Sequence, residues 1–194
     1  MDPRPIHILG IAGSLRRASF NRGLIRAAVE LAPAGISVSA FDLHEVPMFD
    51  ADVEATGDPG PVTALKRAIG EADALLIATP EYNHCIPGVL KNAIDHASRP
   101  YGQSAWRGKP AGVIGITPGT MGTAMAQQHL RNVLANQDMP TMGQPEAFLI
   151  AKPDFFDAPG NIGSDSREFL QKWMDRYAEF VRQHAASPGQ QKAA

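Results

Sequence analysis

Residues 6–21, IHILGIAGSLRRASFN, decide the fold class of this chain. The first half is an apolar run interrupted by one histidine and one glycine, which is typical of a strand buried on both faces. The run ends in a turn of small residues, Ala12-Gly13-Ser14, and helical periodicity begins after Asn21. The stretch therefore predicts a buried strand that turns sharply into a helix.

The turn and the start of this helix form a candidate phosphate site. Backbone N–H groups are unpaired where a strand ends in a turn and a helix begins, and the positive end of the helix dipole lies beside them. Ser14, Ser19 and Asn21 add neutral donors, and Arg16 adds a charged fork that fits phosphate oxygens. The structural alternative is a well-capped helix, with Ser19 as its N-cap and the arginines in solvent.

The absence of two known phosphate-binding motifs limits which class of phosphate ligand this site could bind. The dinucleotide fingerprint G-x-G-x-x-G is not present, because Gly10-Ile11-Ala12-Gly13 has the wrong spacing, and no Gly-Lys-Ser/Thr run ends a triphosphate loop. We therefore expect neither a dinucleotide nor a nucleoside triphosphate held in the usual way. A monophosphate at the end of a larger ligand fits.

The length, charge and composition of the chain exclude several classes of protein. The chain has 194 residues and a formal net charge of −2, so it is long enough for one domain with a core and has no basic excess that favours nucleic acid. Its single cysteine, Cys85, rules out an intramolecular disulfide and suits a reducing compartment, and its six histidines are scattered. No apolar run reaches membrane-spanning length, and no secretory segment opens the chain. We expect a cytoplasmic protein without a metal, a nucleic-acid partner or a membrane partner.

Helix and strand signals alternate along the rest of the chain. The segment 44–61 is rich in Pro, Asp and Gly and predicts a surface loop. Residues 187–194 predict a disordered tail, which leaves 1–186 as a single domain. After the first strand and helix, strands are expected at 37–43, 74–79, 111–117 and 147–151, and helices from 61 onward and at 88–98, 124–137 and 166–183.

Five strands with helices between them predict an α/β fold, a doubly wound parallel sheet with helices on both faces. For a chain of this size, the flavodoxin-like strand order 2-1-3-4-5 fits five strands. In that order strands 1 and 3 are neighbours whose connections leave in opposite directions. Their carboxyl-end loops then border one crevice, where such sheets bind ligands. We expect the loop after Thr79 to complete the site that begins at Gly13.

The loops at 79–88 and 117–123 have the composition of a ligand site. In the first, two prolines stiffen the backbone around Tyr82 and Asn83, a ring and an amide suited to the wall of a planar heterocycle. Its structural alternative is a rigid strand-to-helix turn. The second loop is rich in glycine and hydroxyl groups. Because three loops converge at adjacent strand ends, a ligand is favoured over coincidence.

Two of these loops carry motifs that resemble those of the NADPH-dependent FMN reductase family. Residues 13–21 contain G-S-L-R-x-x-S-x-N, and residues 80–95 contain P-E-Y-N-x-x-x-P-G-x-L-K-N-A-I-D. The branch that the chain most resembles is that of soluble quinone and chromate reductases. The resemblance extends from the first strand to about Glu146.

The resemblance implies an FMN cofactor with its phosphate in the first loop, its isoalloxazine beside the second and its ribityl chain and ring edge along the third. No protein acid or base is expected to be catalytic, because the flavin carries the chemistry. His84 and Cys85 are interpreted as flanking loop positions. The candidate cofactor-binding residues are Ser14, Arg16, Ser19, Phe20, Asn21, Pro80, Glu81, Tyr82, Asn83, Thr117, Gly119, Thr120, Met121 and Gly122.

The activity that the resemblance implies is transfer of a hydride from NADPH or NADH through FMN to a small acceptor by a ping-pong mechanism. Quinones, azo compounds, chromate and free flavin all suit an open flavin face. One alternative is an electron carrier of the flavodoxin kind, although such carriers are usually strongly acidic and this chain is nearly neutral. A second alternative is a flavin-free binding module on the same fold.

The resemblance also implies a homo-oligomer with the flavin near a subunit boundary. Apolar and aromatic residues of 44–49, with Tyr101 and Trp106, are candidates to cover that boundary. A dimer is expected, and a tetramer is possible in this family. At the positions of the family's polar tetramer network, Met125 and Gln128 depart from the pattern, whereas His129, Leu130, Arg131 and Glu146 match it.

Overall fold

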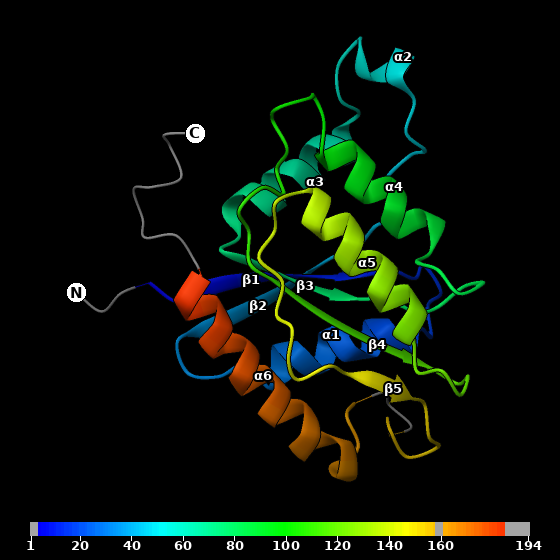
Figure 1. Cartoon of the computed structure of the whole chain (residues 1–194), viewed down its shortest axis with the longest axis vertical. Coiled ribbons are helices and arrows are strands. Elements are labelled where there is room, and N and C mark those ends of the chain that lie inside the picture. Colours follow the sequence, from blue (N-terminus) through cyan, green and yellow to red (C-terminus); the bar gives the residue numbers. More distant parts are fainter. Residues whose placement is uncertain (1–3, 158–160, 185–194) are drawn as a thin grey trace.

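Strand β3 (Ala74–Ala78) lies at the centre of a five-stranded sheet, and all of its residues are buried. The structure is a computed structural model that describes residues 4–157 and 161–184. All strands are parallel, in the order β2-β1-β3-β4-β5, which confirms the predicted flavodoxin-like order (Figure 1). The other strands are β1 (Ile6–Ala12), β2 (Ile36–Phe41), β4 (Ala111–Thr117) and β5 (Phe148–Ile150).

Helices cover both faces of this sheet. Figure 1 shows α1 (Phe20–Glu30) and α6 (Ser164–His184) on one side, and α3 (Gly60–Glu71), α4 (Gly88–Ala97) and α5 (Ala124–Asn136) on the other. Alternate side chains of β3 enter opposite layers. Leu76 packs with α1 and α6, while Leu75 and Ile77 pack with α3, α4 and α5. A central strand covered on both faces must be apolar throughout, which explains the unbroken run in the sequence.

The segment 44–61 differs from the predicted loop because it contains a short helix, α2 (Ala51–Glu54). Asp50 caps this helix, since its side chain accepts a hydrogen bond from Asp52 N–H at 2.9 Å. The residues before α2 are held on α4 by Asn92, whose Oδ1 accepts from Phe49 N–H at 2.8 Å and whose Nδ2 donates to Pro47 O at 2.7 Å. This segment is therefore anchored to the helical layer.

Trp106 is not at the surface, so its predicted place at a subunit boundary is wrong. Its side chain is fully buried among α3, α4 and α5, and its indole N–H donates to Ile94 O at 3.1 Å. Tyr101, in contrast, is 91% exposed. The predicted tail at 187–194 lies outside the described residues. No helix in the described part of the chain is both long and apolar enough to cross a bilayer.

Candidate functional site

Loop 13–19 leaves β1 beside the carboxyl end of β3. Gly13 N–H donates to Ala78 O at 2.8 Å, which ties the start of the loop to β3. A Cβ on Gly13 would lie 3.2 Å from Leu90 Cδ2 and 3.3 Å from Pro80 Cδ, so a larger residue would have to displace its neighbours. The loops that follow β1 and β3 are therefore in direct contact, as the strand order predicts.

Two serine hydroxyl groups and the guanidinium group of Arg16 lie at the start of α1. Ser19 is the N-cap, and its Oγ accepts a hydrogen bond from Arg22 N–H at 3.4 Å. Ser14 Oγ accepts from Arg16 N–H, also at 3.4 Å. Both serines are buried, whereas Arg16 is exposed. The structural role of Ser19 as N-cap is thus present, and it keeps the hydroxyl beside the positive end of the helix dipole.

Asn21, a candidate phosphate residue, joins α1 to β4. Its Nδ2 donates to Ile116 O at 2.9 Å and its Oδ1 accepts from Ile116 N–H at 3.1 Å. Two residues earlier on the same side of β4, Ile114 O accepts from Thr79 N–H at 2.9 Å. Asn21 therefore continues the pairing of β4 where β3 turns away. This contact fixes the start of α1 against β4 and engages both polar atoms of the Asn21 side chain.

The carboxylate of Glu81 bonds to the start of α5. Its Oε2 accepts from Ala126 N–H at 3.1 Å, and its Oε1 lies 3.3 Å from His84 Nδ1. Thr123, the N-cap of α5, has a left-handed φ of 70° and makes no side-chain capping bond. Glu81 therefore caps α5 from another loop, where a negative charge is favourable. Sequence reasoning missed this contact and the approach of His84 to Glu81.

Tyr82 and Cys85 flank a tight two-residue turn. Their backbones exchange two hydrogen bonds of 3.0 Å, and Asn83 and His84 have φ values of 51° and 61°, typical of a type I′ turn. The turn presents the half-exposed ring of Tyr82, whose hydroxyl oxygen lies 3.4 Å from Ser14 Oγ. Tyr82 thus reaches from the loop after β3 to the loop after β1.

The loop after β4 packs against β5. Gly119 N–H donates to Thr117 Oγ1 at 3.3 Å. Gly122 has a φ of 58°, and a Cβ there would lie 2.7 Å from Phe148 O, so both conformation and space require glycine. Between these glycines, Thr120 and Met121 are exposed. The loop's position is fixed while its tip is open to a ligand.

The three loops enclose one cavity of about 370 Å³, which we call the three-loop cavity. Its lining confirms the expected convergence and adds Ile116 and Pro118, which no sequence signal had singled out. Candidates Asn83, Gly119, Thr120, Met121 and Gly122 lie in the same loops but outside this lining. The lining residues are Ser14, Arg16, Ser19, Phe20, Asn21, Pro80, Glu81, Tyr82, Ile116, Thr117 and Pro118.

The chemistry of the three-loop cavity suits an FMN molecule. Serine hydroxyls, a guanidinium group and the start of a helix gather on one side and favour an anion. Pro80 and Tyr82 supply flat apolar surfaces on another side. The carboxylate of Glu81 is engaged by the start of α5, so its negative charge is partly offset there. Among the described residues, no group of three or more His, Cys, Asp or Glu side chains could hold a metal.

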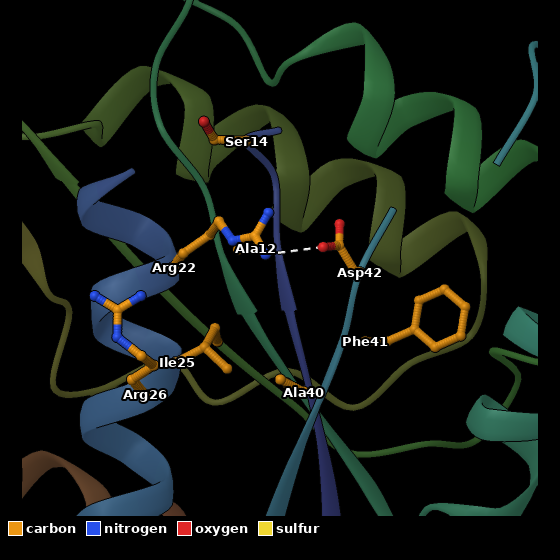
Figure 2. A pocket seen from close by; sticks show the side chains of 9 residues that line it. Ala12, Ser14, Arg22, Ile25, Arg26, Ala40, Phe41 and Asp42 are labelled. Carbon is orange, nitrogen blue, oxygen red and sulfur yellow. Dashed lines mark hydrogen bonds and ion pairs between the residues drawn. The ribbon is translucent and has the colours of Figure 1, made fainter. Parts of the chain in front are cut away.

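A smaller cavity of about 180 Å³ lies on the other side of the end of β1, and we call it the β1–β2 cavity. Figure 2 shows Arg22 of α1 and Asp42 after β2 pointing toward one another across it, and their ion pair measures 2.8 Å. Ser14 lines both cavities. Because this ion pair joins two opposite charges across the smaller cavity, the three-loop cavity is the better seat for a large anionic cofactor.

A doubly wound sheet of order 2-1-3-4-5 with a cavity at its topological switch point is a flavodoxin-like fold, in which ligands bind outside the carboxyl ends of the strands. The family model of NADPH-dependent FMN reductases matches residues 6–153. A 2-hydroxy-1,4-benzoquinone reductase of Burkholderia sp. is 48% identical over 178 residues, covering 91% of this chain and 97% of the relative. An NAD(P)H-dependent FMN reductase of Pseudomonas aeruginosa is 43% identical, covering 91% and 96%.

Solved structures agree with these sequence comparisons. The flavoenzyme NAD(P)H:(acceptor) oxidoreductase FerB of Paracoccus denitrificans matches with a TM-score of 0.87 and 36% identity, covering 93% of this chain and all of that one. The chain belongs to the NADPH-dependent FMN reductase family. It is therefore an oxidoreductase that uses FMN with a nicotinamide co-substrate, as its motifs predicted.

Proposed function

We propose that this protein oxidises NADPH or NADH and reduces a small quinone-like acceptor, with the two substrates binding in turn at the open face of an FMN molecule held in the three-loop cavity. The observation that carries this proposal is the meeting of all three loops at one cavity, with an anion seat and an aromatic wall. When bound there, FMN supplies the redox chemistry, because it exchanges two electrons with the nicotinamide and then with the acceptor.

The residues of the cavity have separate tasks in this proposal. Ser14, Arg16 and Ser19 bind and orient the phosphate, with α1 adding its dipole. Pro80 and the backbone of the following turn support the flat ring system, and Tyr82 flanks it. The loop tip at 119–122 borders the ring edge and the ribityl chain. No side chain needs to move a proton in the oxidation of the nicotinamide.

A quinone is the acceptor that the relatives favour. The Burkholderia protein is named a 2-hydroxy-1,4-benzoquinone reductase, and a protein of Pseudomonas putida that is 42% identical is named a quinone reductase. A flat ring can stack where the nicotinamide stacked, beside the half-exposed Tyr82. Azo compounds, chromate and free flavin are further acceptors that an open flavin face would admit.

Steady-state kinetics test this proposal. Initial rates with NADPH or NADH and 1,4-benzoquinone, both varied, should give parallel double-reciprocal plots, because one substrate leaves before the other binds. Intersecting plots would show that both substrates bind together and would contradict the shared flavin face. A bound flavin that neither NADPH nor NADH reduces would instead indicate an electron carrier without its own nicotinamide oxidation activity.

We further propose a homodimer in the cytoplasm. Apolar side chains at Met48 and Tyr101 are 78% and 91% exposed, as expected of residues that a second copy covers. Light scattering should give a mass roughly twice the 20.8 kDa of the chain. A monomer would refute the dimer, and a mass near four chains would indicate the tetramer. The single cysteine agrees with a reducing compartment, and cell fractionation tests the location.

A further inference from the structure

Three aromatic rings and a guanidinium group form a continuous series of contacts at the start of α1. The Arg16 Cζ atom lies 5.5 Å from the ring centroid of Phe20, within cation–π range. The rings of Phe20 and Phe156 stack with centroids 6.2 Å apart and planes 8° apart. Phe156 in turn contacts Phe155, with centroids 5.0 Å apart. The series joins the connection between β5 and α6 to the three-loop cavity.

The far end of this series is anchored. Phe155 is buried in the layer of α1 and α6, and its O accepts from Gly163 N–H at 3.0 Å. Phe156 forms a backbone bridge with Ile162. A Cβ on Gly23 of α1 would lie 2.8 Å from Phe156 Cζ, so the missing side chain leaves the space that the ring occupies. Phe156 is thus held between α1 and its own loop.

The near end is exposed. Arg16 is a long side chain in solvent, and fixing it over one spot costs rotamer entropy unless something holds it. Phe20 lines the three-loop cavity together with Arg16, whereas Phe156 does not line it. The stacking contact with Phe156 restricts rotation of the Phe20 ring, so the ring keeps its orientation beside the guanidinium of Arg16.

We propose that Phe156 is a positioning residue for the anion seat of the three-loop cavity. It holds the ring of Phe20, and that ring holds Arg16 at the phosphate. The proposal rests on the proposed placement of the FMN phosphate beside Arg16. It assigns part of the selectivity for FMN over riboflavin to the connection after β5, a segment outside both motif loops.

The test compares dissociation constants of FMN and riboflavin, which differ by the phosphate. The full-length protein is freed of flavin and titrated with each compound by flavin fluorescence. Phe156→Leu should weaken FMN binding about fivefold, as expected for loss of one exposed cation–π contact and its ordering, with riboflavin binding within twofold of wild type. Phe156→Tyr keeps the ring and should retain the wild-type preference. Phe169→Leu, an exposed aromatic on α6, is the matched control.

The results for wild type and for Phe156→Leu test two different claims, the placement of the phosphate and the role of Phe156. A wild-type protein that binds both flavins equally would refute the placement of the phosphate, and this proposal with it. A wild-type preference for FMN that persists in Phe156→Leu, or an equal loss for both flavins, would overturn the role of Phe156 alone. If Phe156→Leu does not fold, Phe156→Met replaces it.

A double-mutant cycle gives a second readout. If Phe156 acts through Phe20, then Phe20→Leu with Phe156→Leu should bind FMN no more weakly than Phe20→Leu alone. Additive losses would show that the two residues act independently, which contradicts the proposal.

Discussion

Glu81 shows how a single side chain couples two loops of the site. Its carboxylate caps α5 while its backbone lies in the loop after β3. We expect Glu81→Ala to reduce the free energy of unfolding by about 1–2 kcal/mol, because a charged cap is lost. FMN affinity should also fall, since the two loops are no longer joined. Urea unfolding and flavin titration measure the two effects.

Glu81→Gln is the matched variant, because an amide oxygen can still accept from Ala126 N–H. It should lose less stability and less FMN affinity than Glu81→Ala. If both variants behaved like wild type, the capping bond would have no role in the site.

The burial of Tyr177 should make the free energy of unfolding depend on pH in the alkaline range. Its ring is fully buried, its hydroxyl donates to Leu75 O at 2.5 Å, and burial raises its pKa well above the usual value. The unfolded chain therefore loses this proton first as the pH rises. The free energy of unfolding should be unaffected by this group below about pH 10 and should fall by about 1.4 kcal/mol per pH unit above it.

Tyr177→Phe removes that titration. Its unfolding free energy should be lower than that of wild type at pH 8 by about 1 kcal/mol, because Leu75 O loses a donor. The difference between the two proteins should shrink between pH 10 and 11. An unchanged difference across that range would show that Tyr177 ionises equally in both states.

Residue-level contacts divide into those that the sequence could predict and those that it could not. Ser14, Arg16 and Ser19 lie in one local motif, so spacing alone places them beside the start of a helix. The bond of Asn21 to Ile116 joins residues 95 apart, and that of Glu81 to Ala126 joins residues 45 apart. Such partners follow from the packing of elements, which no local pattern encodes.

At the scale of elements, Asn92 of α4 helps to hold the connection between β2 and α3, together with His96 of the same helix. Asn92 is buried and holds both Pro47 O and Phe49 N–H. We expect Asn92→Ala to cost about 1–2 kcal/mol of unfolding free energy, because Phe49 N–H loses its acceptor, while Pro47 O keeps His96 Nε2 at 3.0 Å. Amide hydrogen exchange should accelerate at residues 48–50 more than in β3, with the largest change at Phe49 N–H.

Lys91→Ala is the control for Asn92→Ala. Lys91 is the preceding residue and makes an exposed ion pair with Asp95 at 2.6 Å. Its removal should change stability by less than about 0.5 kcal/mol. Equal effects of the two substitutions on amide exchange at 48–50 would contradict the anchoring role of Asn92.

Helices and strands were predicted well where the hydrophobic pattern was long. They were predicted less well where a capping residue determines the start of a helix. The apolar run of β3 and the periodicity of α5 identified both elements. The short helix α2 was not predicted, because its start depends on the Asp50 cap within a segment rich in Pro and Gly. Trp106 was misplaced because its aromatic character does not tell whether it faces solvent or the layer beneath α4.

At the scale of the whole molecule, the sheet order places the site. The ends of β3 and β4 come close together at Gly115 of β4. A Cβ there would lie 2.2 Å from Thr123 Oγ1 and 2.4 Å from Thr79 O. Gly115→Ala should therefore push apart the ends of β3 and β4 and cost about 1–3 kcal/mol. Thermal unfolding measures the loss, and Gly143→Ala, which has open space, is the control. An equal effect of both substitutions would contradict the close approach.

The central claim is that one cavity at the ends of β1, β3 and β4 holds FMN by its phosphate. A crystal structure of the flavin-loaded protein tests this claim most directly. We expect the phosphate oxygens within hydrogen-bonding distance of Ser14, Arg16 and Ser19, with the ring system beside Tyr82. A phosphate in the β1–β2 cavity, or a flavin bound away from all three loops, would contradict it.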